Sequence, residues 1–306
     1  MRVVITGATG TIGLAVADAL RSRGDQVVAL SRDAERGKHV LGEGVEVHPW
    51  TRPTAESPPP EALAGAAAVI NLVGEQVAQR WTDEAKARIR DSRVLATRSL
   101  VTALKALPEA DRPRALVSQS ATGYYGDRGD TELDENAPPG DDFLAQVVVA
   151  WEREALGADE IARVVCTRTG VVLSPSGGAL AKMLPFFKLG IGGPVAGGRQ
   201  YVPWIHLDDV VGAILACVDQ QALSGPVNVT APNPVTNAEL SRALGHALRR
   251  PAVLPVPGPA IRALYGEMAE IVTTGQRVVP ARLLAAGYGF RHVLAEPALR
   301  DVVGDG

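Results

Sequence analysis

The chain has few cysteines, few aromatic residues and no paired metal-ligand motif. Of its 306 residues two are cysteines, and aromatic residues make up 4%. Cys166 and Cys217 both lie in apolar runs, so we expect buried small side chains and neither a disulfide nor a thiolate metal site. No CxxC or HExxH motif occurs and the five histidines are isolated, so we expect no metal.

Charge and hydropathy exclude further classes. The net charge is −3 and the arginines are scattered, so nucleic acid is not an expected partner. No apolar stretch reaches the ~18–20 residues that span a bilayer, and the N-terminus begins as a strand and not as a signal peptide. With 46% hydrophobic and 21% charged residues, the sequence predicts a folded cytoplasmic protein that does not bind membranes.

The sequence does contain a glycine-rich turn near its start. The apolar run 3–5 leads into GATGTIG at 7–13, then an alanine-rich helical stretch and a second apolar run at 27–30. A strand that ends at small residues and restarts as a helix suits a pyrophosphate, because the phosphates can approach free N–H groups at the positive helix end. The alternative is a turn used only for tight strand–helix packing. The predicted dinucleotide contacts here are Gly7, Thr9, Gly10, Thr11, Ile12 and Gly13.

The end of the second apolar run bears on which dinucleotide binds. An acidic residue at this distance from the glycines would hold the ribose 2′-OH of NAD. The chain has Ser31 and Arg32 there, a hydroxyl and a guanidinium that suit a 2′-phosphate. Asp33 follows one residue later and weakens the argument. The sequence therefore favours NADP(H) over NAD(H).

Strands and helices alternate through the first two thirds of the chain. This alternation predicts an α/β fold, a Rossmann-type doubly wound parallel sheet with a smaller, partly helical C-terminal substrate lobe. We expect a core over 1–232, to which 174–204 adds part of the second lobe, and that lobe over 233–306. The later predicted strands are 45–49, 67–73, 115–120 and 162–173, and the helices are 82–107, with Thr82 as N-cap, and 143–156.

Several motifs in order carry a family resemblance. They are GATGTIG (7–13), NLVGE (71–75), RWT (80–82), SATGYYGD (120–127), RTGVVL (168–173), KLGIGGPVAGGRQ (188–200), PWIHLDDVV (203–211) and GQRVVPARLLAAGYGFRH (275–292). Together they resemble an atypical extended short-chain dehydrogenase/reductase of the NAD-dependent epimerase/dehydratase subgroup, with its extra C-terminal domain at about 255–303. The resemblance implies a Rossmann core and bound NADP(H).

The catalytic residues of the wider superfamily are only partly present. The resemblance places Ser120 where a Ser polarises the substrate oxygen, but the expected Tyr-x-x-x-Lys pair is missing. Phe143 and Val147 occupy its positions, and no Tyr in the chain has Lys four residues later. A phenol with pKa ~10 needs a nearby cation for proton exchange at neutral pH. Tyr124 or Tyr125 is the candidate replacement, and the alternative is that both only pack or stack.

The resemblance implies further contacts at the same edge of the sheet. Leu72, Val73 and Gly74 would run beside the adenosine, and the alternative for Leu72 and Val73 is ordinary packing at the strand end. Arg93 could reach a phosphate or remain a solvated helix arginine. Arg168 would contact cofactor or substrate, or serve structure.

The second half offers two weaker candidates. Arg199 follows a glycine-rich stretch that suits a lid and could take an anionic substrate group, and the alternative is an ordinary long loop. His206 more often would be a satisfied core residue than a base, and Asp208 or Asp209 would cap the next helix.

Two functions remain open at this point. The first is an NADP(H)-dependent oxidoreductase or epimerase/dehydratase-like enzyme acting on an unknown small molecule. The second is a cofactor-binding sensor or scaffold with little turnover, since relatives of the subgroup have been linked by name to division. The resemblance implies that two chains pair through the 82–107 helix and its neighbour, so a homodimer is a further expectation. The alternative is that this helix face belongs to the core.

Overall fold

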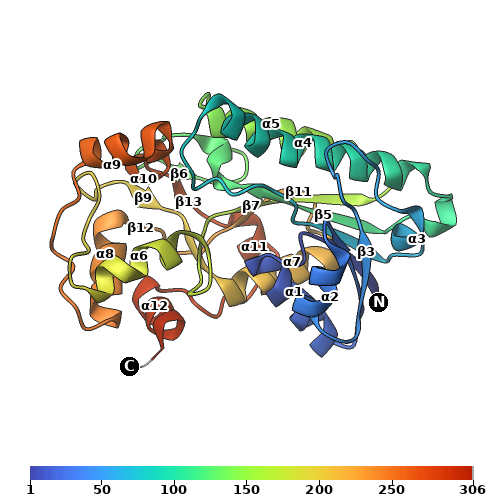
Figure 1. Ribbon diagram of the computed structural model, residues 1–306. Helices are drawn as coiled ribbons and strands as arrows, with labels where there is room; N and C mark the ends of the chain where they lie inside the picture. The colour runs from blue at the N-terminus through green and yellow to red at the C-terminus, as the bar shows by residue number, and fades with distance from the viewer. Residues whose placement is uncertain (305–306) are drawn as a thin grey trace.

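The computed structural model describes residues 1–304, in which one large parallel sheet carries helices on both faces (Figure 1). The sheet has seven strands in the order β11-β7-β5-β4-β1-β2-β3, and every neighbouring pair is parallel. This doubly wound Rossmann-like arrangement confirms the predicted fold class. The strands are β1 (Arg2–Thr6), β2 (Gln26–Ser31), β3 (Val45–Pro49), β4 (Ala68–Asn71), β5 (Ala115–Ala121), β7 (Arg163–Thr169) and β11 (Gly225–Val229).

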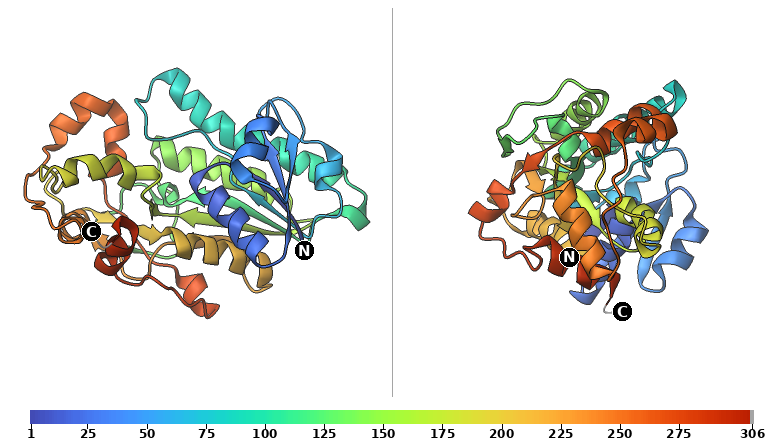
Figure 2. Two further views of the ribbon diagram at one scale, coloured as in Figure 1. Left: turned by 60° about the horizontal axis from the view of Figure 1, so that its bottom comes forward. Right: turned by 90° about the vertical axis from the view of Figure 1, so that its left-hand side faces the viewer.

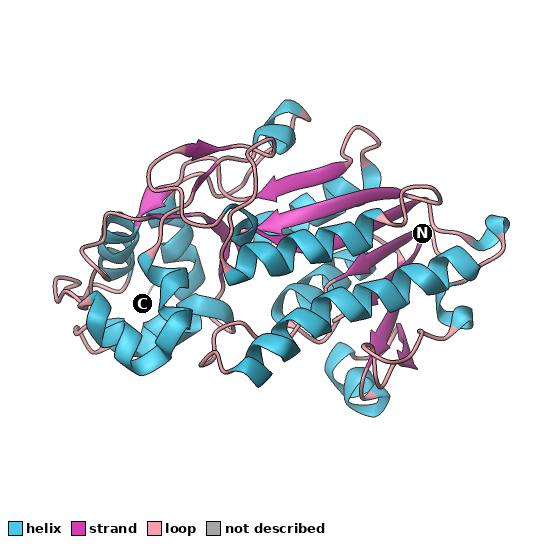
Figure 3. Cartoon of the chain, turned by 90° about the horizontal axis from the view of Figure 1, so that it is seen from above, coloured by secondary structure: helices cyan, strands magenta, loops and turns pink. Residues whose placement is uncertain are grey.

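Two apolar cores lie on opposite faces of this sheet. On one face, α1 (Thr11–Ser22) packs beside α7 (Leu207–Asp219). On the other, α4 (Asp83–Ala106) and α5 (Phe143–Leu156) lie side by side, as the view from above shows (Figure 3). Two short helices, α2 (Ala34–Leu41) and α3 (Pro60–Leu63), complete this region. The order of strand addition reverses between β1 and β4: β2 and β3 lie on one side of β1, and the later strands lie on the other. Doubly wound sheets bind ligands at this point.

Local sequence explains where the long helices begin. The Thr82 hydroxyl accepts from the Ala85 amide, which confirms Thr82 as the N-cap of α4. Asp142 caps α5 in the same way. The predicted helix over 143–156 has the same bounds in the structure, and the predicted helix over 82–107 differs by one residue at each end.

The predicted single strand over 162–173 is wrong in one respect. It is two strands, β7 in the large sheet and β8 (Val171–Leu173), which pairs with β10 (Trp204–His206). Between them the carbonyl of Pro203 lies so close to Gly170 that a Cβ there would approach its oxygen to 2.1 Å. Glycine therefore lets the chain leave the large sheet and start the second lobe.

The second lobe gathers at one end of the sheet (Figure 2). Its core combines α6 (Gly178–Lys188), α8 (Asn237–Ala247) and α12 (Ala295–Val303) with Trp204. Helix α6 lies in the stretch 175–203, where glycine and proline gave no sign of a helix. The remaining elements are β6 (Glu132–Leu133), α6 (Gly178–Lys188), β9 (Tyr201–Val202), β12 (Val235–Thr236), α8 (Asn237–Ala247), α9 (Gly258–Tyr265), α10 (Glu270–Thr273), β13 (Arg277–Val278), α11 (Ala281–Ala285) and α12 (Ala295–Val303). Among the described residues, no helix is long and apolar enough to cross a membrane.

Candidate functional site

The glycine turn between β1 and α1 brings the backbone of two segments close together. Gly7 has φ +67°, and a Cβ there would lie 2.6 Å from the Leu72 carbonyl oxygen. A Cβ on Gly13 would lie 2.3 Å from the carbonyl oxygen of Gly7. The turn is held by a hydrogen bond from the Gly10 amide to the Gly7 carbonyl, at 3.0 Å. Side chains at Gly7 and Gly13 would fill the space in which the turn is folded.

The N-terminus of α1 is open to a ligand. Gly10 is its N-cap, and no side chain caps the helix. The first amides of a helix have no intrahelical partner and carry the positive end of its dipole. Thr9 and Gly10 are exposed, whereas Ile12 packs against the core. The turn therefore fits a pyrophosphate through backbone N–H groups, which is how a dinucleotide would be held.

A segment of the second lobe lies against the first residue of α1. A Cβ on Gly177 would come within 2.3 Å of the Thr11 Oγ1, so the 174–178 segment lies directly against the start of α1. Ser174, the first residue of this segment, is buried, and its hydroxyl lies 3.1 Å from that of Ser176. The start of α1 is thus bordered by both lobes.

The polar side chains at the end of β2 form hydrogen bonds within their own segment. The Ser31 hydroxyl donates to the Asp33 carbonyl at 2.8 Å, and the Asp33 carboxylate accepts from the Arg36 amide at 3.0 Å as the N-cap of α2. Arg32 and Arg36 are both exposed, and neither guanidinium has a side-chain partner among the described residues. The Asp33 carboxylate is therefore used by the helix, and no described side chain pairs with the guanidinium of Arg32 or Arg36.

The predicted contacts after β4 divide into backbone and side-chain roles. The Leu72 and Val73 side chains pack against the cores on opposite faces of the sheet. Arg93 donates to the carbonyls of Ile89 and Glu75, each at 3.0 Å, and lies under Gly74. Burial lowers the pKa of Arg93 to about 10. In this structure the guanidinium braces the loop after β4 by these two bonds.

A buried ionic network occupies the ends of β5 and β7. The Ser120 hydroxyl donates to Glu152 Oε1 at 2.6 Å. Arg168 donates to both Glu152 oxygens, each at 2.8 Å, so the pair is bidentate. The three residues are 1%, 7% and 3% exposed, respectively, for Ser120, Glu152 and Arg168. Although burial alone would lower the pKa of Arg168, its bonds to Glu152 raise it above the ordinary value. The network places Ser120 and Arg168 in structural contacts.

The two adjacent tyrosines differ sharply. Tyr125 is fully buried, and its hydroxyl donates to Asn228 at 2.7 Å and accepts from Arg168 at 3.1 Å. Burial raises the pKa of Tyr125 to about 12. Tyr124 is half-buried, its ring lies 3.4 Å from the Arg168 guanidinium, and its hydroxyl has no hydrogen-bond partner among the described residues.

The positions expected to hold a Tyr/Lys pair are apolar and packed. Phe143 packs edge-on against Trp81, with ring centroids 5.1 Å apart, and Val147 is buried. Arg128, the cation nearest in sequence to the tyrosines, donates to the carbonyls of Tyr125 and Pro139. Its guanidinium is therefore engaged by the backbone of its own loop.

The two candidates in the second half lie in different surroundings. Arg199 is exposed, and the preceding glycine-rich loop is hydrogen-bonded to the 254–256 segment through Gly192, Pro194 and Ala196. His206, not Asp208 or Asp209, is the N-cap of α7, because its Nδ1 accepts from the Asp208 amide. A histidine ring can take this role where the neighbouring carboxylates point elsewhere: Asp209 accepts from the amides of Arg291 and His292.

Sequence reasoning missed two residues that shape the site. Glu152 lies in an apolar helical run, and its signal was a single acidic residue on the buried face of that helix. Arg36 lies in the first turn of α2, directly after the end of β2, and its signal was a second arginine close to Arg32 in the sequence.

Comparison with known proteins gives two family matches. The model of the "NAD dependent epimerase/dehydratase family" matches residues 3–230, and a "Domain of unknown function (DUF1731)" matches residues 256–302. A relative in Mycobacterium bovis, "Epimerase family protein Mb2239", is 44% identical over 95% of this chain and 93% of its own length.

Two solved structures are similar over nearly the whole chain. One is the human epimerase family protein SDR39U1 with NADPH, with a TM-score of 0.88, 34% identity and 99% of each chain covered. The other is a nucleoside-diphosphate sugar epimerase from Corynebacterium glutamicum, with a TM-score of 0.76 and 32% identity, covering 99% of this chain and 58% of that one.

Proposed function

The chain belongs to the NAD dependent epimerase/dehydratase family, and from this premise we propose that it is an NADP(H)-dependent oxidoreductase or epimerase-like enzyme that acts on a small molecule. The bound nicotinamide would supply hydride chemistry. The observation that carries the proposal is the open, uncapped α1 N-terminus behind a turn that only glycine can fill.

The preference for NADP(H) rests on the end of β2. A carboxylate that accepts the ribose 2′-OH would repel a 2′-phosphate, but Asp33 is engaged as the cap of α2. Arg32 and Arg36 are exposed, without partners among the described side chains, and can pair with a phosphate. A similar protein with NADPH supports the same preference.

Titration of the purified protein with NADPH and NADH, followed by nucleotide fluorescence, tests this preference. We expect NADPH to bind at least about tenfold more tightly, because a 2′-phosphate adds charge-assisted bonds. Arg32→Ala combined with Arg36→Ala should bring the two affinities close together. Lys38→Ala is the matched control, since it removes the same charge from α2 but its ammonium pairs with Glu35 at 2.8 Å. Equal affinities in the wild type would contradict the proposal.

Turnover requires a group that exchanges a proton with the substrate. Of the proposed groups, Ser120 and Tyr125 are held in the buried network, and the hydroxyl of Tyr124 remains free among the described residues. Tyr124 follows β5 at the carboxyl edge of the sheet, the edge that also carries the glycine turn. We therefore assign the proton-exchanging role to Tyr124, with the Arg168 guanidinium against its ring.

A substrate screen tests the enzymatic role. NADPH absorbance would be followed across carbonyl compounds, and nucleoside-diphosphate sugars would be tested for epimerisation by chromatography. With any substrate found, Tyr124→Phe should lower kcat about 10²-fold or more, the range of general acid–base catalysis. Loss of kcat in Tyr124→Phe without loss of NADPH affinity would separate chemistry from binding.

A second function has one observation in its favour. The network that binds Ser120, Arg168 and Tyr125 leaves few titratable groups free at the reaction end, which suits a cofactor-binding sensor or scaffold. Tight NADPH binding without turnover across the whole panel would favour this function over the enzyme.

A further inference from the structure

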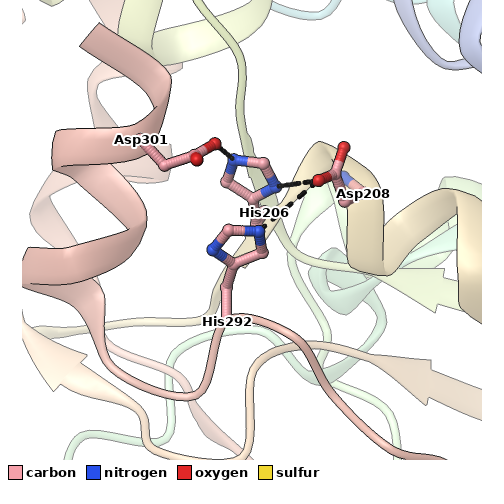
Figure 4. A group of neighbouring side chains, drawn as sticks. All are labelled: His206, Asp208, His292 and Asp301. Carbon is pink, nitrogen blue, oxygen red and sulfur yellow. Dashed lines mark hydrogen bonds and ion pairs between the residues drawn. The ribbon is translucent and has the colours of Figure 1, made fainter. Parts of the chain in front are cut away.

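Two histidines and two aspartates meet away from the residues of the candidate site, where the end of β10 and the start of α7 face α12 and the loop before it (Figure 4). One potential ligand atom from each of His206, Asp208, His292 and Asp301 lies within 4.8 Å of the others. His206 Nε2 is 3.2 Å from Asp301 Oδ2, and an Asp208 oxygen is 3.5 Å from His292 Nε2. Asp208 Oδ2 is also 3.8 Å from His206 Nδ1.

The strongest sign of a ligand is His206 itself. The residue is 5% exposed, and its Nε2 has no hydrogen-bond partner of suitable geometry, although Asp301 lies within ion-pair distance. Figure 4 shows this nitrogen aimed at the Asp301 carboxylate. A buried polar atom without a hydrogen bond is costly, so such an atom calls for a ligand.

The two imidazole rings are stacked, with centroids 3.7 Å apart and 24° between their planes. Below the rings, the buried Asp209 carboxylate accepts from the His292 amide at 2.9 Å and so fixes the backbone of that residue.

We propose that this cluster binds a divalent ion of the zinc class, with His206 Nε2, an imidazole nitrogen of His292 and the Asp301 carboxylate as ligands. Imidazole combined with carboxylate favours Zn²⁺, Co²⁺ or Ni²⁺ over Mg²⁺ and Ca²⁺. The exposed side of Asp301 leaves room for water as the fourth ligand.

Metal binding moves one proton and turns one ring. Because Nδ1 of neutral His206 accepts from the Asp208 amide, its proton is on Nε2 in the metal-free protein. The proton of Nε2 moves to Nδ1, which frees the Nε2 lone pair for the ion. Nδ1 then gives up the bond from the Asp208 amide and donates instead to the Asp208 carboxylate, whose Oδ2 lies 3.8 Å away. Asp208 then holds the ring from outside, as carboxylates do for metal-bound histidines. His292 turns out of the stack to aim its nitrogen at the ion.

The position of the site suggests what the ion does. His206 and Asp208 lie in the part that matches the epimerase/dehydratase family, and His292 and Asp301 lie in the part that matches the domain of unknown function. An ion here would join the end of the chain to the start of α7. It would stabilise the docking of α12 without touching the glycine turn.

Isothermal titration of the chelator-treated protein with ZnCl₂ tests the site, with the visible spectrum of Co²⁺ as a second measurement. We expect one ion per chain, a higher Tm with Zn²⁺, and Co²⁺ bands typical of low coordination number. His292→Asn and Asp301→Asn should each weaken binding more than about tenfold, and Asp208→Asn by about tenfold.

Glu296→Gln is the matched control, because it removes one carboxylate from the same helix outside the cluster. It should bind Zn²⁺ as the wild type does, and circular dichroism should show all variants folded. Absence of stoichiometric Zn²⁺ binding in the wild type would overturn the site. Equal binding by His292→Asn, Asp301→Asn and the wild type would also overturn it.

Discussion

The candidate site has two ends that are built in opposite ways: a dinucleotide end at α1 and β2, and a reaction end where β5 and β7 finish. At the dinucleotide end, the α1 N-terminus is uncapped and Arg32 is exposed. At the reaction end, Ser120 and Arg168 are buried and joined through Glu152. The polar groups at the dinucleotide end have no partner among the described side chains, whereas those at the reaction end are hydrogen-bonded to one another. Cofactor binding and chemistry therefore place different demands on this chain and should respond differently to mutation.

Removing the centre of the buried network should have the largest effect. Glu152→Ala leaves the Arg168 guanidinium buried without its bidentate partner, which costs about 3–5 kcal/mol in the free energy of unfolding. Urea denaturation measures this loss. Glu160→Ala is the control, because Glu160 is exposed and pairs at 3.6 Å with Lys105, a contact worth less than about 1 kcal/mol. Equal effects of the two variants would remove the contrast between the two ends.

The next largest effect should come from a methyl group in the glycine turn, and it should mainly lower the affinity for NADPH. Gly7→Ala puts a Cβ 2.6 Å from the Leu72 carbonyl oxygen at φ +67°, so the turn must shift, at a cost of about 1–3 kcal/mol. NADPH affinity measured by fluorescence should fall about tenfold or more. Gly24→Ala matches the backbone strain, with φ +84°, but its Cβ meets no atom within 4 Å. It should therefore leave NADPH binding intact.

The two tyrosine hydroxyls sharpen the comparison inside the reaction end. Tyr125→Phe removes a partner from both Arg168 and Asn228 and should cost about 1–2 kcal/mol of stability. Tyr124→Phe should change stability by less than about 0.5 kcal/mol, because no described group bonds its hydroxyl. Urea denaturation of the two variants, run in parallel, gives the contrast. A larger loss in Tyr124→Phe would contradict the assignment.

The Tyr125 phenol also predicts a pH dependence. Its folded-state pKa of about 12 lies above the ordinary value of 10, so the neutral form is favoured by folding. The stability it contributes is full below pH 10 and is lost as the pH rises toward 12. Absorbance titration should show a late-ionising tyrosine fraction near pH 12 that falls by one phenol in Tyr125→Phe, while Tyr288, whose pKa is also raised by burial, keeps the remainder.

The smallest effect tests the dinucleotide end. Asp33→Ala removes the α2 cap and should cost about 1 kcal/mol of stability. If Asp33 serves only this helix, the ratio of NADPH to NADH affinity should not change. A rise in NADPH preference in Asp33→Ala would show that the carboxylate faces the ribose.

The fold was largely predictable because its signals are local. Buried strands, the Thr82 cap and the glycine turn each depend on a few neighbouring residues. The split of 162–173 was not predictable, because it depends on Pro203, more than thirty residues away from Gly170. Helix α6 was missed since proline within it contradicts the local rule, and it is held by packing in the second lobe.

The sequence could predict at which edge of the sheet the candidate residues lie, but not which hydrogen-bond partners their side chains have. The residue types after β4, β5 and β7 indicate an edge of the sheet, and the structure brings them to that edge. Whether Ser120, Arg93 or Arg168 faces solvent or a partner depends on distant groups such as Glu152, which periodicity cannot pair. The Arg199 loop likewise forms hydrogen bonds with the 254–256 segment that glycine content does not predict.

Gly177 lies against Thr11, so the second lobe rests on the start of the helix that would meet the phosphates. A dinucleotide that reaches this helix shares its entrance with the 174–178 segment. Its association rate then depends on how often that segment moves aside, and its residence time on how the segment returns. Stopped-flow kinetics of NADPH binding, more than equilibrium affinity, would therefore show the contribution of the second lobe.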